Sequence, residues 1–126
     1  MLKGEDLSLR DLYVRTVKHS VSGVLLETPR VSPHQGTETV TMPYKPSMRK
    51  EGTDWPLYGM TMIGMDRLDN LQMAVEDVLM TGVPGDFVEC GVWRGGASIF
   101  ARALFAAHGA SGRKVHLVDS FKVRCG

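Results

Sequence analysis

The stretch DFVECGVWRGGASIF, residues 86–100, decides the fold of the second half of the chain. Its apolar start, DFVEC, predicts a β-strand, and the alanine-rich run GASIFARALFAAHG predicts a helix that ends at Gly109. The next run, RKVHLVDSF, predicts a second strand with Val115, Leu117 and Val118 buried. A strand, a glycine-rich turn, a helix and a strand form a βαβ unit with parallel strands and a right-handed crossover. The predicted fold class is therefore α/β.

The turn between the first strand and the helix is rich in glycine. Gly91 allows the chain to bend sharply and a ligand to approach the backbone. Gly95 and Gly96 stand at the start of the helix and are expected to leave its first N–H groups free to face a ligand. The turn follows the carboxyl end of a parallel strand, where open α/β sheets bind their ligands.

Two acidic residues favour one ligand over another. A dinucleotide site requires G-x-G-x-x-G, but Glu89 stands where its first glycine belongs and would repel a pyrophosphate. A carboxylate there suits a charged amino group, and S-adenosylmethionine carries an amino group and no phosphate. Asp119 ends the second strand, before Ser120, where a carboxylate can accept from both hydroxyls of a ribose. The residues favour S-adenosylmethionine, and a nicotinamide-dependent oxidoreductase is the alternative.

Ordinary structural roles compete with these assignments. Glu89 could cap a neighbouring helix, and Asp119 could start a turn. Trp93 fits either the core or the mouth of a ligand site. Arg94 is expected to pair with an acid on the surface rather than to touch a substrate.

The N-terminal part is predicted to hold one helix and a loop. Six residues recur at the three- and four-residue spacing of an amphipathic helix within residues 7–27, with Asp6 or Ser8 as its cap. They are Leu9, Leu12, Tyr13, Val17, Val21 and Val24. Residues 28–56 are rich in proline and lack a regular period, which predicts a linker or, as we favour, a lid that orders when a ligand binds.

A further helix is predicted from DRLDNLQMAVEDVLM, with Asp66 as N-cap and one apolar face formed by Leu68, Leu71, Val75 and Val78 or Leu79. Residues 1–56 are therefore expected to form a helix-and-lid segment, and residues 57–126 the ligand-binding domain.

Composition excludes several classes of protein. A net charge of +1 gives no electrostatic case for nucleic acid or an anionic membrane. No apolar run approaches the roughly 20 residues of a membrane span, and the N-terminus lacks the apolar core of a signal peptide. The two cysteines, Cys90 and Cys125, and the scattered histidines form no metal-ligand spacing, and a reducing, cytoplasmic setting is expected.

Residues 54–121 resemble the macrocin O-methyltransferase-like family through the blocks TMIG, RLDNLQ, VPGDFVE, GVWRGG and VDSF. The run LRDLYVRTVKHSVSGVL, residues 9–25, is similar to the first helix of that family. The resemblance implies a class I methyltransferase with a Rossmann-like parallel sheet, which uses S-adenosylmethionine and magnesium to methylate a hydroxyl of a sugar or polyol. It implies a small-molecule acceptor as partner. Neither nucleic acid nor a membrane is expected as a partner, on the charge and composition given above, and a homo-oligomer is possible.

The resemblance also assigns residues to the cofactor. Thr61 and Ile63 would close over it, Glu89 and Gly91 would bind its methionine part, and Asp119 and Ser120 would hold its adenosine. The full set of expected cofactor-binding residues is Thr61, Ile63, Glu89, Gly91, Val92, Gly95, Asp119 and Ser120.

One departure from the family follows the block DSF. The family continues with GLP, but here Phe121 is followed by KVRCG. The magnesium ligands and the catalytic base belong to the half of the family domain expected after this point, so no catalytic or metal-binding residue is assigned here. The chain is expected to be the N-terminal part of such an enzyme, inactive alone. The alternative is a non-catalytic cofactor-binding or assembly fragment.

Overall fold

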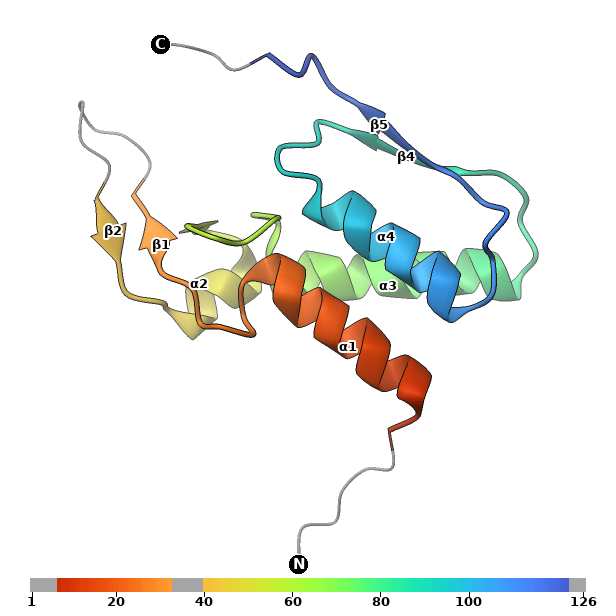
Figure 1. Ribbon diagram of the computed structural model, residues 1–126, viewed down its shortest axis with the longest axis horizontal. Coiled ribbons are helices and arrows are strands. Elements are labelled where there is room, and N and C mark those ends of the chain that lie inside the picture. Colours follow the sequence, from red (N-terminus) through yellow and green to blue (C-terminus); the bar gives the residue numbers. More distant parts are fainter. Residues whose placement is uncertain (1–6, 33–39, 123–126) are drawn as a thin grey trace, which may run out of the picture.

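The computed structural model describes residues 7–32 and 40–122, in which three long helices form the centre (Figure 1). In chain order the elements are α1 (Leu9–Ser22), β1 (Arg30–Val31), β2 (Thr41–Met42), α2 (Pro46–Glu51), β3 (Trp55–Pro56), α3 (Gly64–Met80), β4 (Phe87–Cys90), α4 (Gly96–Ala107) and β5 (Val115–Val118). Within the described ranges, no helix is long and apolar enough to cross a membrane.

The βαβ unit predicted from the sequence is confirmed. β4 and β5 pair in parallel, in a register that runs from Phe87 opposite Val115 to Cys90 opposite Val118. Both strands contact α4, which connects them and lies along one side of the pair (Figure 1). The α/β class is therefore correct.

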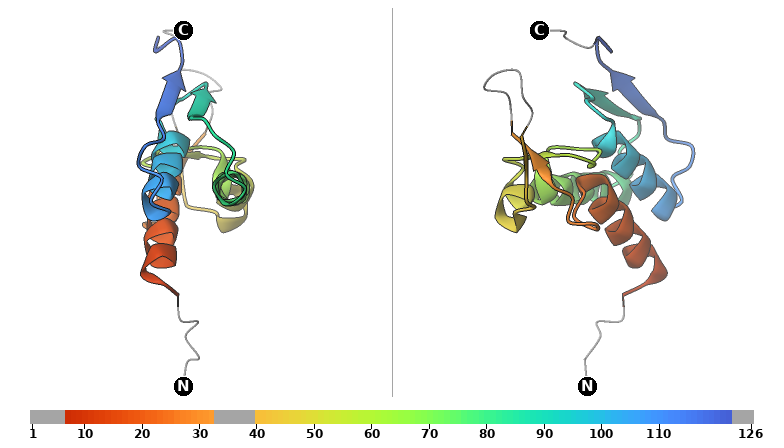
Figure 2. Two further views of the ribbon diagram at one scale, coloured as in Figure 1. Left: turned by 90° about the vertical axis from the view of Figure 1, so that its right-hand side faces the viewer. Right: turned by 60° about the vertical axis from the view of Figure 1, so that its left-hand side comes forward.

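The apolar core lies between α1, α3 and α4. Figure 2 shows α3 end-on beside α1 and α4. Phe100 and Leu104 of α4 and Leu68 of α3 are fully buried there. The cluster comprises Val14, Val21, Leu68, Val75, Phe100, Leu104 and Phe105. The apolar face predicted for α3 is confirmed, since Leu71 and Leu79 pack against the same cluster.

The first helix is shorter than predicted, and only part of its predicted apolar stripe is buried: Val21 lies in the core and Val17 packs against it. Ser8 caps it, because the Ser8 hydroxyl accepts the Asp11 N–H at 3.1 Å; the alternative cap, Asp6, lies outside the described residues. Gly23, in the left-handed conformation, ends it. Val14 and Val21 are buried, whereas the predicted Leu9, Leu12 and Tyr13 are exposed. The first turns of α1 extend past α3 and α4 (Figure 1). The apolar side chains there stay exposed because no other element covers them.

Two further local predictions are wrong. Asp66 does not cap α3, because Ile63 holds the cap position without a side-chain bond and Asp66 instead pairs with Lys50 at 2.8 Å. Leu117 and Val118 of β5 are 48% and 53% exposed rather than buried. In the described residues β4 and β5 form a two-stranded sheet, so there is too little structure around these side chains to bury them.

The prediction of an irregular segment over residues 28–56 is also wrong for the part that the structure describes. β1 pairs antiparallel with β2 and with β3, and α2 lies between β2 and β3 in the chain. These strands of two residues are too short to produce a readable alternation. Pro46 is compatible with α2 because it occupies the first turn, where its missing N–H costs nothing.

A buried arginine organises this segment. Arg49 of α2 is 1% exposed and forms a two-pronged ion pair with Asp54, through Nε at 3.0 Å and Nη2 at 2.9 Å. Its guanidinium also donates to the Ser22 carbonyl at 3.0 Å and the Thr28 carbonyl at 3.1 Å. The end of α1, the start of the small sheet and α2 are thereby joined at one side chain.

Candidate functional site

The carboxyl ends of β4 and β5 bring the predicted acids and the glycine turn together. The Gly91 N–H donates to the Val118 carbonyl at 2.9 Å, and the Val92 N–H donates to Asp119 Oδ2 at 2.7 Å. Because the strands are parallel and in register, Glu89 and Asp119 stand at the same edge of the sheet on either side of this turn. This is the edge at which α/β sheets bind ligands.

Glu89 is half-buried and touches the helix that follows it. One carboxylate oxygen, Oε2, accepts the hydroxyl proton of Ser98. This bond runs to a side chain, not to the free N–H groups at the start of α4, so Glu89 does not cap that helix. Within the described residues, Ser98 is the one hydrogen-bond partner of this carboxylate, and the other oxygen retains its capacity to accept from a donor in the turn.

Gly91 has the backbone conformation and the open surroundings that a close ligand requires. Its φ is +82°, a left-handed value that favours glycine. A Cβ atom at this position would meet no atom within 4 Å. The space beside the turn is therefore open, and glycine is required here by the backbone and not by crowding.

The N–H groups of Gly95 and Gly96 both donate within the fold. The Gly95 N–H donates to the Val92 carbonyl at 2.9 Å, and the Gly96 N–H donates to the Met60 carbonyl at 2.8 Å. A Cβ atom on Gly96 would lie 2.5 Å from the Met60 carbonyl carbon. The expectation of free N–H groups at the helix start is therefore wrong for Gly96, the first residue of α4, whose N–H brings the chain before α3 against this helix.

Thr61 and Ile63 both belong to this neighbouring segment. Thr61 is 5% exposed, and its hydroxyl oxygen accepts the Ile63 N–H at 3.4 Å. Thr61 lies beside Gly96, where an added Cβ would come within 2.8 Å of the Thr61 side chain. Ile63 packs against the helical core. The structure brings Thr61 to the glycine turn and directs Ile63 into the core.

Asp119 combines a turn role with a place in the site. Its carboxylate accepts the N–H groups of Val92 and of Phe121, the latter at 3.1 Å. These N–H groups, that of Val92 foremost, lower the pKa of Asp119 below its ordinary value of 3.8. The side chain is therefore ionised at neutral pH. Ser120 beside it is exposed and donates its hydroxyl to Asp119 Oδ1 at 3.4 Å.

Trp93 and Arg94 form a cation–π contact that was not predicted from the sequence. Trp93 is 43% exposed and has a φ of +50°, which is unusual for a large side chain. The Arg94 guanidinium lies 4.2 Å from the centre of the Trp93 ring. The prediction that Arg94 pairs with a surface acid is wrong, because its Nη1 donates to main-chain carbonyls of residues 56, 57 and 59.

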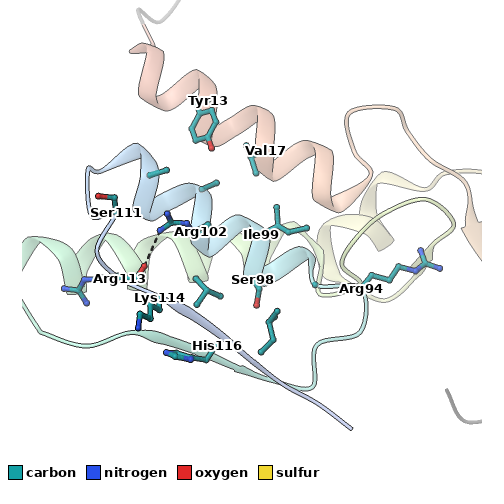
Figure 3. Close-up of a pocket in the computed structure, with 15 residues that line it drawn as sticks. Tyr13, Val17, Arg94, Ser98, Ile99, Arg102, Ser111, Arg113, Lys114 and His116 are labelled. Atoms are coloured by element: carbon teal, nitrogen blue, oxygen red, sulfur yellow. Dashed lines mark hydrogen bonds between the residues drawn. The ribbon is translucent and has the colours of Figure 1, made fainter. Parts of the chain in front are cut away.

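A groove of about 970 Å³ lies between α1, α4 and β5 (Figure 3). Tyr13 and Val17 of α1 and Ile99 of α4 line its apolar side, and Lys114 and His116 lie along the strand side (Figure 3). Of the predicted cofactor residues, Gly95 alone lines it. The groove therefore flanks the predicted site and does not coincide with it.

The described residues contain no group of three or more His, Cys, Asp or Glu side chains that could share a metal ion.

A parallel βαβ unit with a glycine turn between two strand-end carboxylates places the chain in the Rossmann-like α/β class. The model of the macrocin-O-methyltransferase (TylF) family matches residues 8–124. The chain belongs to this family.

Characterised relatives agree with this membership. The chain is 47% identical over 115 residues to the 8-demethyl-8-(2,3-dimethoxy-alpha-L-rhamnosyl)-tetracenomycin-C 4'-O-methyltransferase of Streptomyces olivaceus, a match that covers 90% of this chain. It is 41% identical over 111 residues to the demethyldecarbamoylnovobiocin O-methyltransferase of Streptomyces niveus, covering 88% of this chain. The solved structure of the O-methyltransferase NovP matches with a TM-score of 0.78 at 41% identity, over 89% of this chain.

The matches differ strongly in how much of each protein they include. The chain spans 42% of the two relatives and 43% of the NovP chain. The likeness therefore covers most of this sequence and less than half of each relative.

Proposed function

We propose that this chain carries the S-adenosylmethionine-binding part of an O-methyltransferase that acts on a hydroxyl of a sugar or polyol natural product. The observation that carries the proposal is the position of Glu89 and Asp119 on either side of the open Gly91 turn. Membership of the macrocin-O-methyltransferase family supports it, as do relatives named as O-methyltransferases of a tetracenomycin C, a novobiocin and a mycinamicin compound.

Glu89 would bind the amino group of the cofactor. Ser98 occupies one of its oxygens and thereby fixes the direction of the carboxylate, while the other oxygen can accept from an ammonium group. A charge-assisted bond of this kind is stronger than a neutral one and discriminates against a phosphate. The open space beside Gly91 would receive the methionine part against the backbone, and the buried side chain of Val92 would support the turn from below.

Asp119 would bind the ribose. A carboxylate has about four lone-pair positions, and the N–H groups of Val92 and Phe121 occupy two. The Ser120 hydroxyl makes a third, longer bond at 3.4 Å. One ribose hydroxyl would take the open position, and the other would replace the long Ser120 bond. Asp119 is ionised at neutral pH, as an ordinary aspartate is, and the N–H groups that lower its pKa favour that form further. Ser120 would add a hydroxyl at the adenosine end.

The cofactor, once bound, supplies an electrophilic methyl group on its sulfonium. The residues of this chain would bind and orient it, with Thr61 closing the site from the segment before α3 and Gly95 shaping the start of α4. Ile63 would act through the core, since it packs there. The remaining length of the enzyme would supply the acceptor site, the catalytic base and the magnesium ligands. The division at residue 56 into a helix-and-lid segment and a cofactor domain stays a prediction.

Calorimetric titration of the 126-residue chain with S-adenosylhomocysteine tests the proposal. We expect micromolar binding, weakened roughly 10- to 100-fold by Glu89→Gln, because a hydrogen bond to a charged group contributes about 1.5–3 kcal/mol. The matched control is Glu51→Gln, which removes an exposed carboxylate at the end of α2 and should leave the affinity unchanged.

Two outcomes contradict the proposal. Binding of NAD without binding of S-adenosylhomocysteine would favour the nicotinamide-dependent alternative. A folded chain that binds neither would favour an assembly fragment without a cofactor site.

A further inference from the structure

We propose that Arg94 is a positioning residue that fastens the segment Pro56–Gly59 to the glycine turn, so that the chain leading to Thr61 and the turn behave as one unit. This inference rests on the proposed function, because the unit would form one wall of the cofactor site. The conformational link itself is a separate property of the chain and can be measured without a ligand.

The contact is specific in its geometry. A single nitrogen of Arg94, Nη1, donates to the carbonyl of Gly59 at 2.9 Å, of Leu57 at 3.0 Å and of Pro56 at 3.1 Å. The three carbonyls therefore converge on one point, although they lie more than thirty residues before Arg94 in the chain. Such a convergence requires a defined backbone shape over residues 56–59.

The acceptors are main-chain atoms, which matters for what the contact does. Side-chain changes in residues 56–59 do not remove these acceptors, but any change in backbone shape separates them. The guanidinium cannot lose its charge at ordinary pH, so the contact does not respond to protonation. Arg94 thus recognises the conformation of the segment rather than its sequence.

A second link joins the same two parts a short distance away. The Gly96 N–H donates to the Met60 carbonyl, and there is no room for a Cβ between them. On its other side the segment is held by α1, because the N–H groups of Met60 and Thr61 both donate to the Val21 carbonyl. The Arg94 and Gly96 contacts therefore both hold the residues that immediately precede Thr61.

Trp93 directs Arg94 toward the segment. Its ring faces the guanidinium at 4.2 Å and restricts where that group can point. Its left-handed backbone is disfavoured for a large side chain. A glycine would fit this backbone position better, so the tryptophan is present for what its side chain contacts. Strained residues of this kind gather at ligand sites.

Hydrogen exchange of the unliganded chain tests the link. In Arg94→Met we expect the amides of Leu57, Met60, Thr61 and Gly96 to exchange at least about tenfold faster, while those of Leu104 and Phe105 keep their rates. Arg94→Lys should fall between Met and wild type, since an ammonium keeps the charge and donors but not the flat face that stacks on Trp93. The matched control is Arg102→Met, which removes an exposed arginine from α4, the helix that follows the turn; its guanidinium donates to the Arg113 carbonyl.

Two results would overturn the inference. Unchanged exchange at the four segment amides would show that Arg94 does not hold the segment. Equal acceleration at Leu104 and Phe105 would show a general loss of stability in place of a local link.

Titration with S-adenosylhomocysteine then separates this inference from the proposed function. Affinity lowered in Arg94→Met and unchanged in Arg102→Met supports the segment as a wall of the cofactor site. An affinity that is unchanged in both variants would show that the segment is not a wall of the cofactor site. A wild-type chain that shows the exchange pattern but no binding overturns the proposed function and retains the link.

Discussion

Two regions of the described chain are stabilised by different kinds of interaction. Between the end of α1 and β3, the most buried large side chain is charged: Arg49 is 1% exposed and its polar contacts join three elements. Between α3 and α4, the fully buried side chains are apolar, with Leu68, Phe100 and Leu104 all at 0% exposure. One region is built around a hydrogen-bonded ion pair and the other around packing.

This difference predicts how each region fails. A buried ion pair is directional, and removing one partner leaves a charge without compensation in a place that water does not reach. An apolar core tolerates changes of shape better, provided that the volume is kept. The small sheet is therefore expected to depend on single residues to a degree that the helical core does not.

The largest expected effect comes from breaking the polar centre. Arg49→Ala should reduce the free energy of unfolding by about 3–5 kcal/mol, because the Asp54 carboxylate then stays buried without its partner. Denaturant unfolding measures this loss. The control is Lys50→Ala on the same helix, which breaks the exposed pair with Asp66 and should leave the free energy of unfolding almost unchanged. Equal losses in the two variants would contradict the contrast between the two regions.

A smaller effect is expected where the two regions meet. Gly96→Ala places a Cβ 2.5 Å from the Met60 carbonyl carbon, and the resulting overpacking should cost about 1–3 kcal/mol in the free energy of unfolding. Elsewhere in a helix the same change is favourable. Gly112→Ala is the control, since its Cβ would meet nothing within 4 Å and its φ is not positive. Thermal or denaturant unfolding without a loss for Gly96→Ala would show that Met60 can move away freely.

The comparison also explains which parts could be predicted from the sequence. α3 was predictable from its apolar periodicity, α4 from its alanine-rich composition, and β4 and β5 from the apolar runs on either side of α4. The glycine turn between β4 and α4 marks the topology. β1, β2, β3 and α2 were not. Their order derives from Arg49, whose partners at Ser22 and Thr28 lie more than twenty residues away and follow no local pattern.

The candidate site divides along the same line. The positions of Glu89, Gly91 and Asp119 follow from parallel pairing, because parallel strands bring their carboxyl ends to one edge. The roles of Gly96 and Arg94 do not follow from it. Both depend on the segment before α3, which returns to the turn from another part of the fold. A glycine with a free N–H and a glycine packed against a carbonyl look the same in a sequence.

The smallest expected effect concerns a polar anchor that, unlike Arg49, is exposed. The N–H groups of Val92 and Phe121 stabilise the ionised form of Asp119, so its folded-state pKa lies below 3.8. A lowered pKa means that the stabilisation is fully present above the unfolded-state value and is lost as the pH falls through the folded-state value. Carbon-13 NMR titration of the Asp119 carboxyl should give a midpoint below 3.8 in the folded chain and near 3.8 in urea. The stability difference between wild type and Asp119→Asn should be constant from about pH 5 to 7 and shrink below about pH 4. A folded-state midpoint at or above 3.8 would show that the Val92 N–H does not stabilise the ionised Asp119 carboxylate. Asp119 could then not serve as the exposed counterpart of the buried Arg49.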